Sequence, residues 1–170
     1  EIEYITSNRE TSGTKITFKP DVSIFSETSE YDYKILATRL RDLAFLNAKI
    51  TLTLTDLRVI NENGEPKKEI FYSETGLDEF VRYIDSNKEH LIEDVIHIDT
   101  ERQGIPVEVA LTYNTSYNEN IYAFVNNINT IEGGTHLTGF RRGLTGTLKK
   151  YAEDNKMLEK AKVEIASDDF

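Results

Sequence analysis

The sequence predicts an α+β protein, in which helices are laid on mostly antiparallel sheets. Two observations carry this prediction: apolar residues recur every three or four positions in two segments of the first half, and they alternate with polar residues in the second half. The composition changes from helix-rich to strand-rich between residues 85 and 94, which indicates a boundary between two domains. We therefore expect two small domains with helices packed on sheets.

The first predicted elements are a strand and a helix. Residues 14–18, TKITF, alternate and then meet Pro20, which suits a strand that stops there. A helix is expected over about 30–47, where Ser29 and Asp32 resemble a capping box. Its predicted buried face consists of Tyr33, Leu36, Leu40, Leu43 and Asn47.

A hairpin and a short helix follow. Residues 50–56, ITLTLTD, alternate most regularly, with Ile50, Leu52 and Leu54 expected inside. The Asn63-Gly64 pair predicts a turn, after which KEIFY returns as the second strand. The stretch LDEFVRYIDSNK then predicts a short amphipathic helix that ends near Asn87.

The second half predicts three strands, a loop, a helix and a last strand. The strands are expected at 95–99, 107–113 and 120–127, the helix at about 136–152 and the last strand at 161–166. A glycine loop around Gly133-Gly134 precedes the helix. Leu137, Phe140, Leu144, Leu148 and Tyr151 should share one face of this helix, and Arg142 and Lys149 a different, exposed one.

Composition excludes several classes of function. The chain has no cysteine, so disulfides and thiolate metal sites are excluded. No apolar run approaches 18 residues and no signal-peptide pattern is present, so we expect a cytoplasmic location and no membrane partner. The net charge of −10 argues against general binding of nucleic acid. Residues 136–162 nevertheless hold seven basic against three acidic residues, which fits either a surface for a polyanion or a solvated helix face.

Motifs of catalysis are absent from the sequence. His90, His97 and His136 show no metal-ligand spacing, so no metal site is predicted. His136 is the best candidate for a functional histidine because it begins a helix beside two glycines, although capping would also explain a polar side chain there. No nucleophile elbow, Walker loop or dinucleotide fingerprint occurs.

Several motifs, taken in order, carry a resemblance to a known family. They are SGTKITFKPD at 12–21, RLRDLAFLN at 39–47, IPVEVALTYN at 105–114, FVNNINTIEGGTHLTGFRRGLT at 124–145, and the final SDDF. The series closely resembles the ATPase subunit of bacterial type IIA DNA topoisomerases, whose members are of the gyrase B and topoisomerase IV types. Because the chain lacks an initiator Met and ends in ASDDF, we expect it to be part of a longer protein.

The resemblance implies a fold and a domain boundary. Residues 1–85 would form the C-terminal part of a GHKL ATPase α/β sandwich. Residues 86–170 would form the first, incomplete part of a transducer domain, a βαβ fold also seen in a ribosomal protein, with helices on one face of a mixed sheet. The glycine loop would then shape the beginning of a helix that borders the cavity for DNA.

The resemblance also implies roles for five residues. Gly13 and Thr14 match the position on the adenine side of the ATP-binding site. Arg141 and Arg142, together with Lys149, match or neighbour basic positions on the helix that faces the DNA cavity, where they would contact duplex phosphates without reading bases. No catalytic residue and no metal ligand of the family falls within this chain.

For the full-length subunit, the resemblance implies an ATP-dependent type II DNA topoisomerase, with ATP and Mg²⁺ as cofactors. Its ATP hydrolysis would drive passage of duplex DNA through a double-strand break and change DNA supercoiling. The implied partners are double-stranded DNA, a DNA-cleaving subunit of the gyrase A type, and a second copy of the full-length subunit on ATP binding, in the cytoplasm at the nucleoid. The chain alone lacks the family's general base and ATP lid, so we expect it to bind no cofactor and to be inactive.

Two alternatives belong to other classes. The first is a stand-alone interaction module that kept the fold without the enzyme, and the second is a GHKL relative in mismatch repair. Within the topoisomerases, the gyrase and topoisomerase IV types fit this sequence equally.

Overall fold

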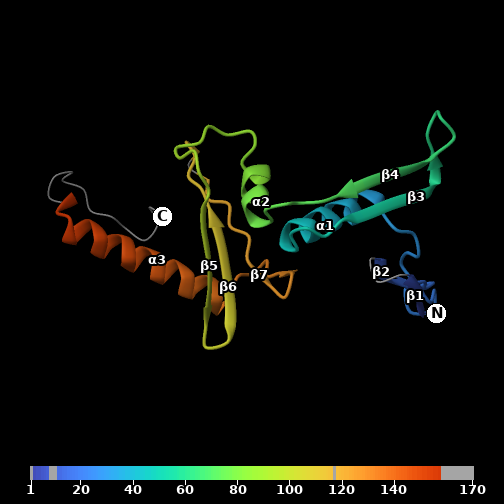
Figure 1. The fold of residues 1–170 in the computed structure, drawn as a ribbon, viewed down its shortest axis with the longest axis horizontal. Helices are drawn as coiled ribbons and strands as arrows, with labels where there is room; N and C mark the ends of the chain where they lie inside the picture. Colours follow the sequence, from blue (N-terminus) through green and yellow to red (C-terminus); the bar gives the residue numbers. More distant parts are fainter. Residues whose placement is uncertain (1, 8–10, 117, 158–170) are drawn as a thin grey trace. The chain divides into compact units, whose positions relative to one another are not determined.

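The described part of the chain forms two compact units. A computed structural model describes residues 2–7, 11–116 and 118–157 (Figure 1). The chain divides into Glu1–Phe80 and Val81–Phe170, shortly before the boundary predicted after residue 85. The assignment of the two parts to an ATPase and a transducer domain stays a prediction. The α+β class is confirmed, since the described residues form three helices and four antiparallel strand pairs.

The strand pairs differ from the mixed sheet that the resemblance implies. Within the described residues each sheet has two strands, consecutive in sequence and antiparallel. Short connections produce this geometry, because a parallel pair needs a crossover of a dozen or more residues. A βαβ arrangement also needs a strand after the last helix, and the predicted strand at 161–166 lies outside the described residues.

The first unit begins with an antiparallel hairpin of β1 (Ile2–Ser7) and β2 (Thr11–Ile16), paired along their whole lengths. The strand predicted at 14–18 is therefore displaced toward the N-terminus. The Ser12-Gly13 dipeptide, a pair of residue types common in turns, lies inside β2 because β1 supplies a partner that the sequence pattern did not reveal.

The helix α1 (Tyr33–Leu46) begins three residues later than predicted. Its N-cap is Asp32, whose Oδ1 accepts a hydrogen bond from the backbone N–H of Ile35 at 3.0 Å. A capping aspartate satisfies one of the free amides of the first turn. The capping box predicted with Ser29 as the N-cap is thus wrong, because the N-cap is Asp32, three residues later.

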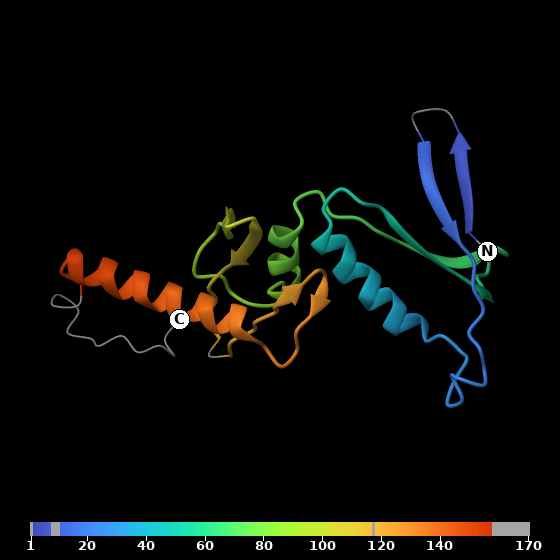
Figure 2. The same ribbon diagram turned by 90° about the horizontal axis from the view of Figure 1, so that it is seen from below.

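This helix packs on a hairpin of β3 (Leu52–Ile60) and β4 (Pro66–Phe71), beside which it lies in both views (Figures 1 and 2). The core consists of buried Ala37, Ala44 and Phe71, with partly buried Tyr33, Leu40, Leu52 and Leu54 packed against them. Two alanines at the centre allow the helix backbone to approach the strands closely. Ile50, expected inside, is 49% exposed because β3 begins two residues after it.

The inward alternation of β3 continues to a charged residue, Asp56, which is 8% exposed. Arg58 donates to both of its carboxylate oxygens at 2.8 Å, and also from Nη2 to the carbonyl oxygen of Tyr31 at 3.1 Å. The hydrogen bond from the Arg58 side chain lowers the pKa of Asp56 from its ordinary value of 3.8 to about 2. A carboxylate is tolerated at this inward position because it is paired.

The helix α2 (Leu77–Ile84) is anchored at its beginning by polar groups. Ser73, which is fully buried, accepts the backbone N–H of Gly76 through Oγ at 2.9 Å. Oε1 of Glu79 accepts the N–H groups of Glu74 and Thr75, both at 2.9 Å. These bonds fix the turn from β4 into α2.

The second unit contains the hairpin of β5 (Ile96–Arg102) and β6 (Ile105–Leu111), as predicted. Gln103 and Gly104 join the strands with φ of 55° and 76°. Two consecutive positive φ values mark the two-residue turn whose twist matches a hairpin.

A second, shorter hairpin corrects the strand predicted at 120–127. Only β7 (Phe124–Val125) and β8 (Ile128–Asn129) pair there, and Asn126 and Asn127 form the turn with φ of 50° and 64°. Asparagine tolerates the left-handed region better than most residues, so the Asn-Asn pair turns the chain instead of extending the strand.

Candidate functional site

The candidate site is the helix α3 (Thr135–Asp154), which confirms the helix predicted at 136–152. Its apolar residues Leu137, Phe140, Leu144 and Leu148 are partly buried, and Ala152 is buried. Tyr151, predicted to share their face, is 59% exposed. None of the described helices combines the length and the apolar composition needed to cross a bilayer.

Arg141, a predicted contact of DNA phosphates, is already paired. It donates from Nη2 to Oε2 of Glu119 at 2.7 Å, and both side chains are close to half exposed. Exposed pairs of this kind contribute between nothing and about 1 kcal/mol to stability. The pair therefore opens at little cost when another anion competes for the guanidinium group.

Arg142 and Lys149 extend the basic surface along the helix. Arg142 is exposed, and no ion pair is found for it within the described ranges. Lys149 is partly buried, so the face predicted to be exposed is exposed at Arg142 and only in part at Lys149. A lysine covers apolar surface with its stem while its ammonium group remains in water. Seven residues separate the two, which places them on one side about 10 Å apart along the axis.

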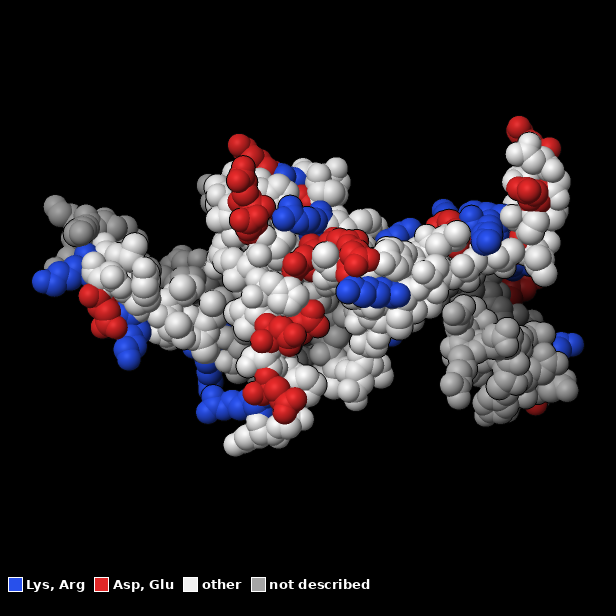
Figure 3. Space-filling model, viewed as in Figure 1, with Lys and Arg blue, Asp and Glu red and all other residues white. Residues whose placement is uncertain are grey.

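Acidic side chains gather elsewhere on the second unit, over the β5–β6 region (Figure 3). The exposed acids are Glu89, Glu93, Asp94, Asp99, Glu101 and Glu108. Of these, Glu108 has its Oε1 atom 3.5 Å from Nε2 of His97. His97 is therefore a strand residue paired with a carboxylate on the neighbouring strand. A polyanion that approaches this unit is repelled from β5–β6 and attracted by α3.

The glycine loop turns the chain into α3. Gly133 has φ of 77° and Gly134, the N-cap residue, φ of 154°, values that favour glycine. No side chain caps the helix. Beside this loop, Oγ1 of Thr130 lies 3.2 Å from Nε2 of His136. The Thr130 hydroxyl donates to the carbonyl oxygen of Ala123 at 3.0 Å, so the imidazole does not activate it as a nucleophile.

The two residues predicted on the adenine side of an ATP site lie in the first unit. Gly13 and Thr14 belong to β2, where they stand opposite Ile5 and Tyr4 of β1. The positions on a regular strand are fixed by this register. Their role toward a nucleotide stays a prediction.

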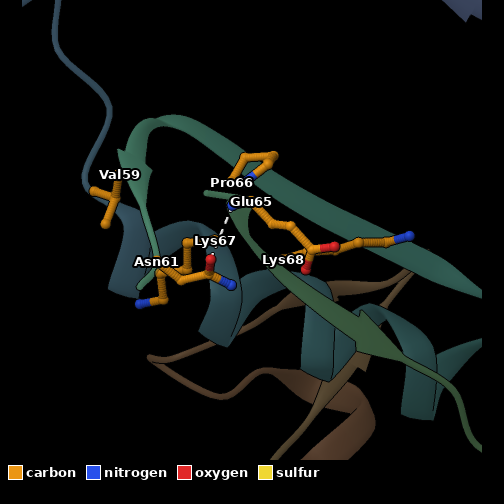
Figure 4. A pocket seen from close by; sticks show the side chains of 6 residues that line it. All are labelled: Val59, Asn61, Glu65, Pro66, Lys67 and Lys68. Atoms are coloured by element: carbon orange, nitrogen blue, oxygen red, sulfur yellow. Dashed lines mark hydrogen bonds between the residues drawn. The ribbon is translucent and has the colours of Figure 1, made fainter. Parts of the chain in front are cut away.

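Other features of the described residues do not resemble a reactive site. No group of three His, Cys, Asp or Glu side chains there could hold a metal ion. A surface depression lies at the β3–β4 turn (Figure 4). At this turn the backbone N–H of Asn61 donates to the carbonyl oxygen of Glu65 at 2.8 Å, and the backbone N–H of Glu65 donates to Oδ1 of Asn61 at 2.9 Å. It is lined by Val59, Asn61, Glu65, Pro66, Lys67 and Lys68.

Sequence reasoning missed two acidic partners in the second unit. Glu119 lies 22 residues before Arg141, and no spacing rule joins the two. Asp85, which is 4% exposed, accepts a hydrogen bond at Oδ1 from Nδ2 of Asn114 at 2.6 Å. A carboxylate at the end of an amphipathic helix gave no signal of burial.

Comparison with known proteins identifies the family. The model of the DNA gyrase B family matches residues 76–170. The DNA gyrase B protein of Cytophaga aurantiaca is 54% identical over 158 residues, which cover 93% of this chain and 33% of that protein. That of Halalkalibacterium halodurans is 44% identical over 157 residues, covering 92% of this chain and 24% of that protein.

Solved structures share the fold. The 43K ATPase domain of Thermus thermophilus gyrase B, crystallised in complex with an aminocoumarin, is 30% identical with a TM-score of 0.72. The match covers 89% of this chain and 39% of that one. The gyrase B protein of Myxococcus xanthus, 23% identical, shares the fold with a TM-score of 0.68, and the match covers 79% of this chain and 36% of that one.

These matches define a class, the B subunits of type II DNA topoisomerases. Within that class, the chain belongs to the DNA gyrase B family. It spans about a third of the length of the Cytophaga relative and about a quarter of the Halalkalibacterium one.

Proposed function

We propose that the chain is the part of a gyrase-type B subunit that couples ATP binding and hydrolysis to the passage of duplex DNA through a double-strand break. The observation that carries the proposal is 54% identity to a DNA gyrase B protein across 93% of the chain. A match of that extent does not favour a mismatch-repair relative. The family match over 76–170 favours the gyrase type over topoisomerase IV.

The proposal divides the work between the two units. Residues 1–85 are the end of the ATPase domain, with Gly13 and Thr14 beside the adenine, and residues 86–170 are the beginning of the transducer. The division of the chain at Phe80 and Val81 supports a boundary in this region. The Thermus relative is an ATPase domain, which supports a nucleotide-binding role for the intact parent protein.

On the second unit, α3 is the proposed contact with DNA. Arg142 and Lys149 meet phosphates directly, and Arg141 joins them when Glu119 releases it. Contacts of this kind position a duplex without reading its sequence. They also make binding depend on salt, because each neutralised phosphate releases counterions.

ATP and Mg²⁺ act in the intact parent protein under this proposal. The described residues do not fit a metal site, so no step is assigned to Mg²⁺ on this chain. The chain by itself is proposed neither to bind ATP nor to hydrolyse it. The proposed partners are duplex DNA, a DNA-cleaving subunit of the gyrase A type and a second copy of the parent protein, in the bacterial cytoplasm at the nucleoid.

The test uses the intact parent protein with its DNA-cleaving partner and relaxed plasmid DNA. ATP-dependent negative supercoiling on an agarose gel is the expected result. ATP-dependent relaxation or decatenation without supercoiling would assign the topoisomerase IV type instead. If an active preparation leaves the topology unchanged with ATP, the proposal is wrong.

A further inference from the structure

One side-chain contact ties the first turn of α3 to the hairpin before it. Thr130, directly after β8, donates from both N and Oγ1 to the carbonyl oxygen of Ala123, at 2.8 and 3.0 Å. Its own carbonyl oxygen accepts the N–H of Gly133 at 2.8 Å. Oγ1 of Thr130 also lies 3.2 Å from Nε2 of His136. Thr130 thus joins the hairpin, the glycine loop and the helix.

The hydrogen bonds fix the direction of this last contact. A hydroxyl group has one proton, and that of Thr130 points to Ala123. With the hydroxyl proton assigned to Ala123, Oγ1 accepts from His136, which assigns a proton to Nε2 of the imidazole. The network assigns a donor to this ring nitrogen.

Gly134 makes room for the ring. A Cβ atom at this position would lie 2.8 Å from Cε1 and 2.9 Å from Nδ1 of His136, closer than such atoms approach. The backbone, with φ of 154° and ψ of 179°, lies in a region that is essentially restricted to glycine. The imidazole occupies the space where a side chain of the N-cap residue would lie, and α3 has no side-chain cap.

We propose that His136 is a positioning residue: its Nε2–H bond to Thr130 locks the first turn of α3 to the β7–β8 hairpin and so sets the direction of the helix that carries Arg142 and Lys149. This role rests on the proposed function of α3. Lys149 lies 13 residues beyond His136, about 20 Å along the axis. A change of about 10° at the first turn therefore moves the position of Lys149 by about 3 Å, enough to break a contact with a phosphate.

Two conservative variants separate the donor from the ring. In His136→Gln the amide nitrogen reaches the place of Nε2 and can donate to Thr130. In His136→Asn the amide nitrogen reaches only the place of Nδ1, so it cannot donate to Thr130. Thr130→Ser keeps the accepting oxygen, and Thr130→Val removes it.

The first experiment follows amide hydrogen exchange over residues 124–138 in the intact parent protein. Exchange should stay at the wild-type level in His136→Gln and Thr130→Ser, and rise roughly two- to fivefold in His136→Asn, the effect of losing one hydrogen bond. It should rise at least as much in Thr130→Val, which also loses the bond from Oγ1 to Ala123. Because Thr130→Val already removes the bond to His136, the double variant His136→Asn with Thr130→Val should exchange no faster than Thr130→Val alone. Equal exchange in all variants would show that the lock does not exist, whatever the protein does to DNA.

The second experiment counts supercoils introduced per ATP hydrolysed, with the DNA-cleaving partner and relaxed plasmid. This ratio should fall by roughly two- to fivefold in His136→Asn and recover in His136→Gln. Faster exchange with an unchanged ratio would overturn the positioning role while the proposed function stands. A wild-type protein without ATP-dependent supercoiling would overturn both.

Discussion

Arg141, on the helix proposed to meet DNA, forms an ion pair at 2.7 Å with Glu119, which lies 22 residues earlier in the sequence. The guanidinium group is therefore occupied in the free protein, and a phosphate must displace a carboxylate to reach it. The phosphate contact therefore gains less than it would with an unpaired guanidinium group, because the pair with Glu119 must open first. Glu119 thus lowers the affinity of this helix for DNA.

The first prediction concerns this pair. Glu119→Gln keeps the shape of the side chain and removes its charge, so Arg141 becomes available to a phosphate. Duplex binding by the intact parent should tighten, and the slope of log K against log salt should steepen by up to about 0.9, the contribution of one phosphate. Fluorescence anisotropy over a salt series measures both quantities.

A matched control is Glu153→Gln, which removes the same charge from an exposed position of α3. It should tighten binding less than Glu119→Gln, because Glu153 lies at the far end of the helix. Identical behaviour of the two variants would indicate a general charge effect and not a specific release of Arg141.

The second prediction is a pH dependence of the first unit. Because Arg58 lowers the pKa of Asp56 to about 2, the ionised carboxylate stabilises the fold above the unfolded pKa near 3.8. This contribution should be lost as the pH falls from about 4 to about 2. Asp56→Asn should lower the melting temperature at pH 7 and remove this part of the pH dependence.

Circular dichroism melts of wild type and Asp56→Asn at several pH values provide the measurement. Glu62→Gln, at the exposed β3–β4 turn, serves as the control and should melt as wild type does. Parallel curves for wild type and Asp56→Asn between pH 4 and 2 would show that the Asp56–Arg58 pair does not contribute.

The third prediction compares two glycines with similar backbones. Gly64 and Gly76 have φ of 80° and 68°, but only Gly76 is crowded: a Cβ there would meet the carbonyl oxygen of Phe45 at 3.2 Å and Cβ of Ala48 at 3.3 Å. Gly64→Ala should cost about 1 kcal/mol from the left-handed backbone alone. Gly76→Ala should cost more, by the strain of those contacts.

Urea unfolding measures how much each variant lowers the free energy of unfolding. The backbone cost common to both cancels when the two losses are subtracted. Equal losses would mean that α2 shifts freely away from the end of α1. A larger loss for Gly76→Ala would show that the turn into α2 is tightly packed.

Local patterns predicted the elements whose signals are local. The β5 and β6 strands and α3 follow from residue types within a few positions of one another. The Asn126-Asn127 turn carried a similar signal, but the apolar run before it favoured a longer strand. Alternation through Leu52 and Leu54 also pointed to an inward residue 56, although not to its partner.

Long-range partners could not be predicted in this way. The pairing of β1 with β2, the bond of Glu119 to Arg141 and the partial burial of Lys149 depend on which segments meet in space. Of the candidate site residues, the sequence placed Arg141, Arg142 and Lys149 on one helix, which the structure confirms. Their contact with DNA stays a prediction.

The central claim is that this chain couples ATP hydrolysis to DNA passage, with α3 as its contact with DNA. The most direct test is the number of supercoils introduced per ATP by the intact parent with its DNA-cleaving partner. Arg142→Ala combined with Lys149→Ala should lower this number by roughly tenfold, on the order of the loss of two phosphate contacts. Lys34→Ala with Lys68→Ala removes the same charge from the first unit and should leave it unchanged. A wild-type number of supercoils per ATP in the Arg142 and Lys149 double variant would contradict the account.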